Sequence, residues 1–542
     1  MPGASSTISI KTVVGLLKRN YIEKLIPHPM HIKKLLILSA MLVAFTANAQ
    51  DDKPDPVIIQ KIREEGLNHS QVMEIAFYLT DASGPRLMQS PGYFRAAEWA
   101  KQKFAEWGLV NPHLEAWGDW GKGWELQKYY LALTAPYYKP LIGFPKTWTT
   151  GTNGLQRAEA VLVDAQDSAT FEPYRGRLQG KIVLTPRTDT LKPTYTADAL
   201  RHSDETLQQM AAYDPSVPLP APKSPPAPAP KPQYVLTGKV KELIQREGAV
   251  AVLSTNPRNA EGTVFVQGGG PFAPNSPPNF LDIAMAYEDY MTIQRLIQHH
   301  IPAKLDIDVQ SEFYDRDVKG YNVVAEIAGR DKNLREQLVM LGGHLDCWQS
   351  ATGATDNAAG CAAAMEAIRI LKQIGFVPRR TIRIALWGGE ETGLFGSRAY
   401  VKNHFADSVT KKFNAEGDKL SVYFNLDNGS GKIRGIYLQG NAKPKDIFTQ
   451  WFAPFADLGA GTITLQNTGG TDHLSFDAIG LPAFQFIQDP IEYGSRTHHS
   501  NMDSYDHLQP EDLKQAATII ASFIYNAAQR EAKIPRKEIK AK

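Results

Sequence analysis

From residue 321 onward, short apolar runs alternate with segments of helical periodicity. The apolar runs cover residues 339–341, 382–387 and 420–426, and the helical segments between them cover residues 358–374 and 397–404. Strands that alternate with helices are joined by crossover connections, which favours a largely parallel sheet covered by helices. We therefore predict an α/β fold built on a mainly parallel, mixed sheet flanked by helices.

Side chains that can hold a metal follow each of these apolar runs. His344 comes after the first run, Glu390 and Glu391 after the second, and Asp427 after the third. The carboxyl ends of parallel strands form the edge at which ligands bind in α/β sheets. His, Asp and Glu are also the ligands of hydrolytic zinc centres. The pattern therefore predicts a site at this edge of the sheet.

Two further aspartates near His344 have both a functional and a structural explanation. Asp346 either holds the second ring nitrogen of a metal-bound His344 or is a solvated loop carboxylate. Asp356 stands at the start of the Ala-rich helix 358–374, where Asp is a good helix cap. A carboxylate at that position can also bridge two metal ions.

The remaining candidates are equally ambiguous when each is taken alone. An adjacent pair such as Glu390-Glu391 is usually a solvated face or a helix start. Asp427 suits a turn, and His498-His499 lie in a polar loop, where a surface His pair is common. Only their combination with the strand ends favours a metal centre.

The net charge of the chain and the absence of certain motifs argue against several other functions. Residues 1–49 hold six Lys/Arg and one acidic residue, so the rest of the chain has a net charge of −3. A nearly neutral body gives no electrostatic reason to expect nucleic acid as a partner. The sequence contains no G-x-S-x-G elbow, Walker loop, Rossmann fingerprint or H-E-x-x-H helix, so the types of chemistry that these motifs carry are disfavoured.

Residues 31–49 have the pattern of a secretory signal peptide. Lys33-Lys34 precede an apolar stretch, and an A-x-A sequence ends at Ala49, before Gln50. The stretch is shorter than the roughly 20 residues that span a bilayer. We expect cleavage near Ala49/Gln50, a secreted or periplasmic protein and no stable membrane span. Translation starts at Met1 or at Met30, and we favour Met30.

The chain before residue 321 has a different organisation. Residues 93–109 have helical periodicity, and residues 129–134 alternate as in a strand. Residues 158–310 form a β-rich unit, with strands expected at 160–163, 181–185 and 248–253 and a helix at 240–247. Its Pro-rich loop, residues 214–232, is either a solvated polyproline or disordered segment or a ligand for a proline-binding module.

The two cysteines, Cys347 and Cys361, leave two alternatives open. An exported protein can pair them in a disulfide. Both lie among small and apolar residues near the proposed site, and nothing else indicates a disulfide framework, so we favour two buried thiols.

Six motifs together resemble the M28 family of zinc peptidases, in particular its aminopeptidases and its carboxypeptidase Q-like branch. The motifs are GGHLDCW (342–348), GATDNAAG (353–360), LWGGEETGLFGS (386–397), NLDN (425–428), GGTDHLSF (469–476) and THHSNMDSYDHL (497–508). The resemblance implies the zinc exopeptidase fold with an inserted protease-associated domain. It divides the chain into an N-terminal extension with signal peptide (1–49), a first part of the peptidase domain (50–157), the inserted domain (158–310), the main part of the peptidase domain (311–530) and a basic tail (531–542).

The resemblance also implies two Zn²⁺ ions per chain and a role for each candidate. His344 and Asp427 would bind one ion, Glu391 and His499 the other, with Asp356 bridging them, Glu390 as general base and Asp346 supporting the ligands. His499 is preferred to His498 because Ser500 follows it and the acidic Asp503 comes four residues later, as in the family motif. His498 has no metal role in this assignment and is free to face the substrate.

The implied function is that of an exported dinuclear zinc exopeptidase acting near the end of peptides or on dipeptides. A metal-bridged hydroxide would be the nucleophile, and Glu390 would accept its proton. Aminopeptidase and dipeptidase or carboxypeptidase activity remain alternatives, as does a homodimer. Two departures from the family are Cys347, where relatives often have Ser, and the lack of a Tyr before Asp472, for which Tyr493 is a candidate substitute.

Two other functions are alternatives on the same fold. A non-catalytic, receptor-like binding protein would be expected to have lost ligands, whereas this chain keeps all five ligand positions and the base. A glutaminyl cyclase is disfavoured by the inserted domain and by the complete ligand set.

Overall fold

The computed structural model describes residues 52–217, 236–406, 410 and 412–538, and the residues from Asp52 onward form one compact unit. The predicted signal peptide lies outside the described residues. So do most of the Pro-rich loop 214–232 and the last four residues of the basic tail. Within the described part of the chain, no helix combines the length and the apolar character that crossing a membrane requires.

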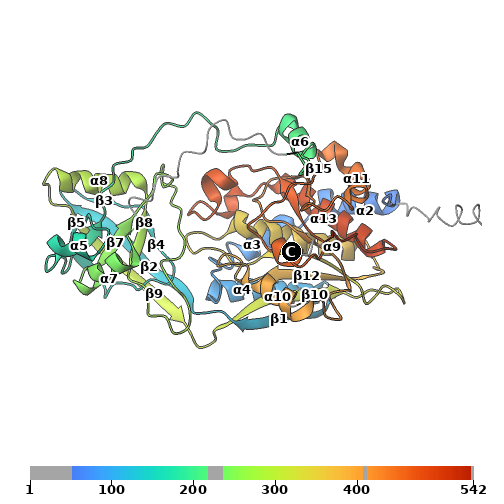
Figure 1. The fold of residues 1–542 in the computed structure, drawn as a ribbon, viewed down its shortest axis with the longest axis horizontal. Coiled ribbons are helices and arrows are strands. Elements are labelled where there is room, and N and C mark those ends of the chain that lie inside the picture. Colours follow the sequence, from blue (N-terminus) through green and yellow to red (C-terminus); the bar gives the residue numbers. More distant parts are fainter. Residues whose placement is uncertain (1–51, 218–235, 407–409, 411, 539–542) are drawn as a thin grey trace, which may run out of the picture. The chain divides into compact units, whose positions relative to one another are not determined.

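The first of two eight-stranded sheets contains the strands predicted from residue 321 onward (Figure 1). Its order is β1 (Val110–Asp119), β10 (Lys319–Ile327), β12 (Thr381–Trp387), β11 (Leu338–His344), β13 (Leu420–Asn425), β16 (Ala483–Gln488), β14 (Ile433–Tyr437) and β15 (Thr462–Thr464). The central strands β12, β11, β13 and β16 are parallel, and β1, β10 and β14 pair antiparallel with their neighbours. The predicted mixed α/β fold is confirmed.

Alternating residues of the central strands supply two separate hydrophobic clusters. Ile382 and Ile384 of β12 join one cluster, and Ala385 and Trp387 join the other. The first cluster contains residues of α2 (Pro56–Asn68), α3 (Val72–Leu79), α4 (Pro91–Glu106), α9 (Ala359–Gln373), α11 (Lys445–Phe452) and α13 (Pro510–Gln529). The second contains residues of α10 (Phe395–His404) and α12 (His473–Asp477). This alternation is the period-two pattern of a strand with both faces buried.

Glycines allow close approach of backbones at the carboxyl end of β11. A Cβ on Gly342 would lie 1.9 Å from the carbonyl oxygen of Ala385 in β12, and one on Gly360 would lie 2.1 Å from that of Leu426. Any side chain at these positions would push β12 or α9 away. The glycines of the GGHLD and GATDNAAG motifs therefore set how tightly the predicted site is packed.

The second sheet has its own core and contains the predicted β-rich unit. Its order is β3 (Lys139–Pro140), β2 (Gly123–Ala135), β9 (Lys304–Tyr314), β5 (Gln156–Leu162), β6 (Ile182–Leu184), β7 (Ala251–Ser254), β8 (Asp282–Met285) and β4 (Gly143–Pro145). Its helices are α5 (Ser168–Phe171), α7 (Gly238–Arg246) and α8 (Tyr287–Gln298). The strands expected at 160–163, 181–185 and 248–253 and the helix at 240–247 correspond to β5, β6, β7 and α7.

The limits of this sheet differ from the predicted unit 158–310. Strand β2 pairs with β9 from Gly123 to Ala135, and β3 and β4 also belong to this sheet, so it begins at Gly123, well before residue 158. Helix α6 (Asp204–Ala211) lies within the predicted unit but packs with β15 and with Ile487 of the first sheet (Figure 1). The local sequence of β2 does not indicate this pairing, because its partner β9 is far away in sequence.

Candidate metal centre

The polar residues that follow β11, β12 and β13 converge at the carboxyl edge of the first sheet. They meet the irregular turn Ala354–Ala358, which leads into α9, and the loop that follows the turn Tyr493–Thr497. A cavity of about 640 Å³ lies over them. Its lining includes Asp356, Glu390, Glu391, Asp427, Tyr493, His498 and His499.

His344 occupies one side of the cluster and is fully buried. Its Nε2 lies 3.1 Å from Oδ1 of Asp356 and 3.4 Å from Oδ1 of Asp427. Oε2 of Glu390 is farther away, at 3.9 Å. Because the opposite ring nitrogen contacts the backbone oxygen of Asp346 at 2.9 Å, the imidazole is fixed with Nε2 facing the carboxylates.

His499 occupies the other side. Its Nε2 lies 2.9 Å from Oε2 of Glu391 and 3.1 Å from Oδ2 of Asp356. The two oxygens of Asp356 therefore face two different imidazoles. This is the arrangement expected of a carboxylate that bridges two cations.

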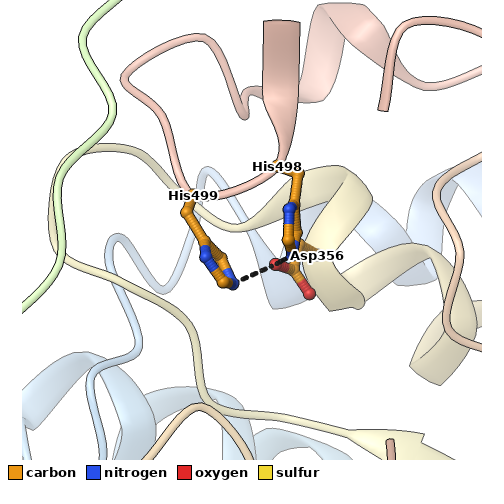
Figure 2. Close-up of side chains that lie close together, drawn as sticks. All are labelled: Asp356, His498 and His499. Carbon is orange, nitrogen blue, oxygen red and sulfur yellow. Dashed lines mark ion pairs between the residues drawn. The ribbon is translucent and has the colours of Figure 1, made fainter. Parts of the chain in front are cut away.

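His498 also points toward Asp356 (Figure 2). Its Nε2 lies 3.7 Å from Oδ2 of Asp356, and its ring centre is 3.7 Å from that of His499. Ligand atoms of Asp356, His498 and His499 lie within 4.8 Å of one another, and so do those of His344, Asp356 and Glu391. The sequence assigned His498 no metal role, so its proximity to Asp356 is a contact that sequence reasoning missed.

Asp346 is close to the cluster but acts on a different partner from the one expected. Its carboxylate accepts hydrogen bonds from the backbone N–H groups of Glu390 and Glu391, at 3.1 and 3.3 Å. Its side chain is 3.7 Å from Nδ1 of His344, whose nearer partner is the Asp346 backbone oxygen. Asp346 thus fixes the turn that carries both glutamates.

Asp503 and Arg86 hold the loops of the site. Neither residue was assigned this role from the sequence. The Asp503 carboxylate accepts from the backbone N–H groups of Thr355 and Asp356 and from the Thr355 hydroxyl. The buried Arg86 guanidinium donates to the backbone oxygens of Leu345 and Gly353. The available signals were the position of Asp503 within the motif at 497–508 and the local sequence Ser83-Gly-Pro-Arg-Leu around Arg86.

The cysteines next to these loops are free, buried thiols, so the disulfide alternative is wrong. The Cys361 thiol donates to the backbone oxygen of His344, and the Cys347 sulfur accepts from the backbone N–H of Arg86. Burial raises the pKa of both thiols to about 12, so both stay protonated and take no part as thiolates.

Charges in the cluster perturb one another strongly. Burial lowers the pKa of His499, but Glu391 and Asp356 outweigh it and raise that pKa to about 10. Burial raises the pKa of Glu391 to about 7, with Asp356 adding to the shift. Burial also raises the pKa of Glu390 well above its ordinary value. Crowded acids in a dry site would be stabilised by a cation.

The donor set fits a metal. The buried atoms Oε1 of Glu391 and Oδ1 of Asp427 accept no hydrogen bond from any described residue. Buried carboxylate oxygens normally have a partner, and a bound cation is one that would satisfy them. Nitrogen from imidazole and oxygen from carboxylates are ligands that zinc accepts.

Asp472 is a further buried acid of this region. It has no exposed surface, and burial raises its pKa to about 7. It belongs to the GGTDHLSF motif, but no role was assigned to it, since nothing in the sequence indicates that it is buried beside the cluster.

The profile of Peptidase family M28 matches residues 322–524, which contain all of the predicted ligands. This part of the chain is an M28 peptidase domain. Carboxypeptidase Q of Homo sapiens is 26% identical to the chain over 461 residues, which is 84% of this chain and 85% of that protein.

Two solved structures resemble most of this fold. A peptidase M28 precursor from Shewanella amazonensis has a TM-score of 0.61 at 22% identity and covers 89% of this chain and 98% of its own. The zinc aminopeptidase BSAP from Bacillus subtilis has a TM-score of 0.52 at 18% identity, with 87% and 96% covered. At these identities the likeness shows the fold, and the fold agrees with the one predicted.

Proposed function

We propose that the protein is an exported dinuclear zinc exopeptidase that cleaves bonds near the ends of peptides or in dipeptides. The observation that carries the proposal is the position of Asp356, whose two oxygens face His344 and His499. One cation would be held by His344, Asp427 and Asp356. The other would be held by Glu391, His499 and Asp356. Zinc fits this nitrogen and oxygen set and occurs in the related BSAP enzyme.

Bound zinc would supply Lewis acidity at the scissile carbonyl and lower the pKa of an attacking water. Glu390 would take the proton of that water and return it to the leaving amine. Its side chain lines the cavity, and its carboxylate is farther from His344 than those of Asp356 and Asp427. Glu391 instead contacts His499 directly. Asp346 would fix the backbone of both glutamates, because its carboxylate accepts hydrogen bonds from their N–H groups.

The other parts of the proposal rest on separate observations. The A-x-A pattern ending at Ala49 supports export, and N-terminal sequencing of secreted protein tests it, with Gln50 expected as the first residue. The second sheet, Gly123–Tyr314, is proposed as the core of the inserted protease-associated domain, because both connections to the first sheet are short. The similarity to carboxypeptidase Q and to an aminopeptidase supports both exopeptidase types.

The test combines metal analysis with product masses. The purified mature chain is expected to contain zinc and to release amino acids from free dipeptides or from the unblocked end of longer peptides. Hydrolysis of N-blocked peptides separates a carboxypeptidase from an aminopeptidase. Zinc without hydrolysis of any of these substrates would contradict the proposal, and conversion of N-terminal glutamine would instead indicate a cyclase. A chain that binds no zinc would favour a receptor-like protein.

A further inference from the structure

A short segment of the chain between β7 and β8, residues 262–267, extends from the second sheet to the metal centre. Val264 and Val266 are buried against Ala284 of β8 and Ala286, with Phe144 of β4 packed beside them. Phe265 and Gln267 alternate with these valines and therefore face the other way, as in a strand. The segment is thus anchored in the second sheet on one side and free to contact another loop on the other.

That other loop is the one that carries His499. The backbone N–H of Val266 donates to the backbone oxygen of His499 at 2.9 Å, and the N–H of Asn501 donates to the oxygen of Val264 at 3.1 Å. The Asn501 side chain accepts from the N–H of Val264 at 2.6 Å. The two segments are therefore paired as a short antiparallel ribbon.

The ribbon holds His499 in an unfavourable backbone conformation. His499 has a φ of 62°, in the left-handed region that residues other than glycine rarely adopt. Such a conformation persists only where the surrounding structure fixes it. Because its carbonyl group is bound by Val266, part of what fixes it comes from the second sheet.

The side chain of Gln267, in the same ribbon, contacts the imidazole of His499. Its side-chain amide nitrogen lies 3.0 Å from Nδ1 of His499, on the side of the ring opposite Asp356 and Glu391. An imidazole that binds a cation through Nε2 carries its proton on Nδ1 and needs an acceptor there. A side-chain amide presents its oxygen or its nitrogen after a half-turn, so Gln267 can accept that proton.

The two imidazoles of the centre are thus oriented by different parts of the molecule. His344 is held by the backbone of Asp346, two residues away in the same loop. His499 is held by Gln267, which is 232 positions away in sequence.

We propose that Gln267 is a positioning residue for His499, and that segment 262–267 makes the affinity for the second metal ion depend on the second sheet. The inference rests on the proposed function, because it takes His499 as a ligand. It adds that the inserted unit completes the metal centre in addition to any part it has in admitting substrate.

The test measures zinc binding to the metal-free chain by competition with a chromophoric chelator. Gln267→Met keeps the length of the side chain and removes the acceptor. The affinity for the zinc ion that His499 would hold is therefore expected to fall roughly 10-fold or more. Gln267→Glu supplies an acceptor and is expected to keep or strengthen that affinity. Gln298→Met, at the exposed end of α8, is the matched control and is expected to bind as the wild type does.

Melting temperatures of the metal-free variants separate positioning from folding. The inference is supported if all variants have equal Tm values and only Gln267→Met loses zinc affinity. A purely structural defect at this position would not be corrected by the Gln267→Glu substitution. Equal zinc affinity in all variants would overturn it while leaving the zinc site itself intact. A wild-type chain that binds no zinc would overturn the proposed function and this inference with it.

Discussion

Oε2 of Glu391 lies 2.9 Å from Nε2 of His499, which joins the turn after β12 to a loop more than one hundred residues later. The preceding Glu390 does not share this partner. Its nearest imidazole is that of His344, at 3.9 Å. Two adjacent glutamates therefore face opposite sides of one cluster, which is the geometric basis for giving them different roles.

Replacement of Glu390 is expected to separate catalysis from metal binding. Glu390→Gln removes the proposed base but no close contact of either imidazole. Zinc content should stay at the wild-type level while kcat falls about 10²- to 10⁴-fold, the usual contribution of a general base. Steady-state kinetics and metal analysis of the same preparation measure both quantities.

Glu391→Gln is expected to lose zinc as well as activity, because it removes a charged contact of His499. Glu242→Gln, at an exposed position of α7, serves as the control and should change neither. If the Glu390 and Glu391 variants have equal zinc content and equal activity, the division of roles between them is wrong.

The adjacent histidines give a second comparison. His499 contacts both Glu391 and Asp356, whereas His498 is 3.7 Å from Asp356 and is the more exposed of the two. We expect His499→Ala to lose about one of two zinc ions per chain. His498→Ala should keep the metal and change KM or kcat, because its ring lines the cavity. Loss of zinc only in the His498 variant would reverse the assignment.

Much of the first sheet was predictable because its signals are local. Strands β11, β12 and β13 are short apolar runs; His344 is the last residue of β11, and Glu390 and Asp427 come shortly after the ends of β12 and β13. Parallel strands bring their carboxyl ends to one edge, so placing these side chains together required no knowledge of distant contacts.

The parts that were not predicted depend on contacts far apart in sequence. Gln267 contacts His499, which lies 232 positions away, and β2 pairs with β9, which is separated from it in sequence by most of the second sheet. Asp346 was expected to hold an imidazole, but its carboxylate binds the N–H groups of the next strand end instead. Nothing in the spacing of His344 and Asp346 distinguishes a side-chain acceptor from a backbone one.

Removing the metal is expected to destabilise the chain. Without cations, Asp356, Glu391 and Asp427 remain buried near one another, and their mutual repulsion opposes folding. A ligand that binds only the folded state stabilises it by about 4 kcal/mol at a concentration one thousand times its Kd. Calorimetry should therefore show a Tm that falls by several degrees with chelator and recovers when zinc is restored. A Tm that chelator does not change would argue against zinc in this cluster.

His404 should make stability depend on pH at a place outside the metal centre. It ends α10 and contacts Glu115 of β1 at 2.7 Å and Glu416 at 3.2 Å. The hydrogen bond to Glu115 raises the pKa of His404 above its ordinary value of 6.5, against the opposing effect of burial. Because the folded chain binds this proton more tightly than the unfolded chain, the stabilisation is complete below about pH 6.5 and is lost as the pH rises through the higher folded-state pKa.

His404→Gln removes this charge, so the difference in Tm from the wild type should be largest near pH 6 and should shrink toward pH 9. Calorimetry across that range measures it. His299→Gln is the matched control, because His299 is exposed at the end of α8 and its ring forms no ion pair with the described residues. A Tm difference for His404→Gln that is the same at every pH would mean that the ring contributes by packing, as its stacking on Tyr400 would allow, and that its charge contributes nothing.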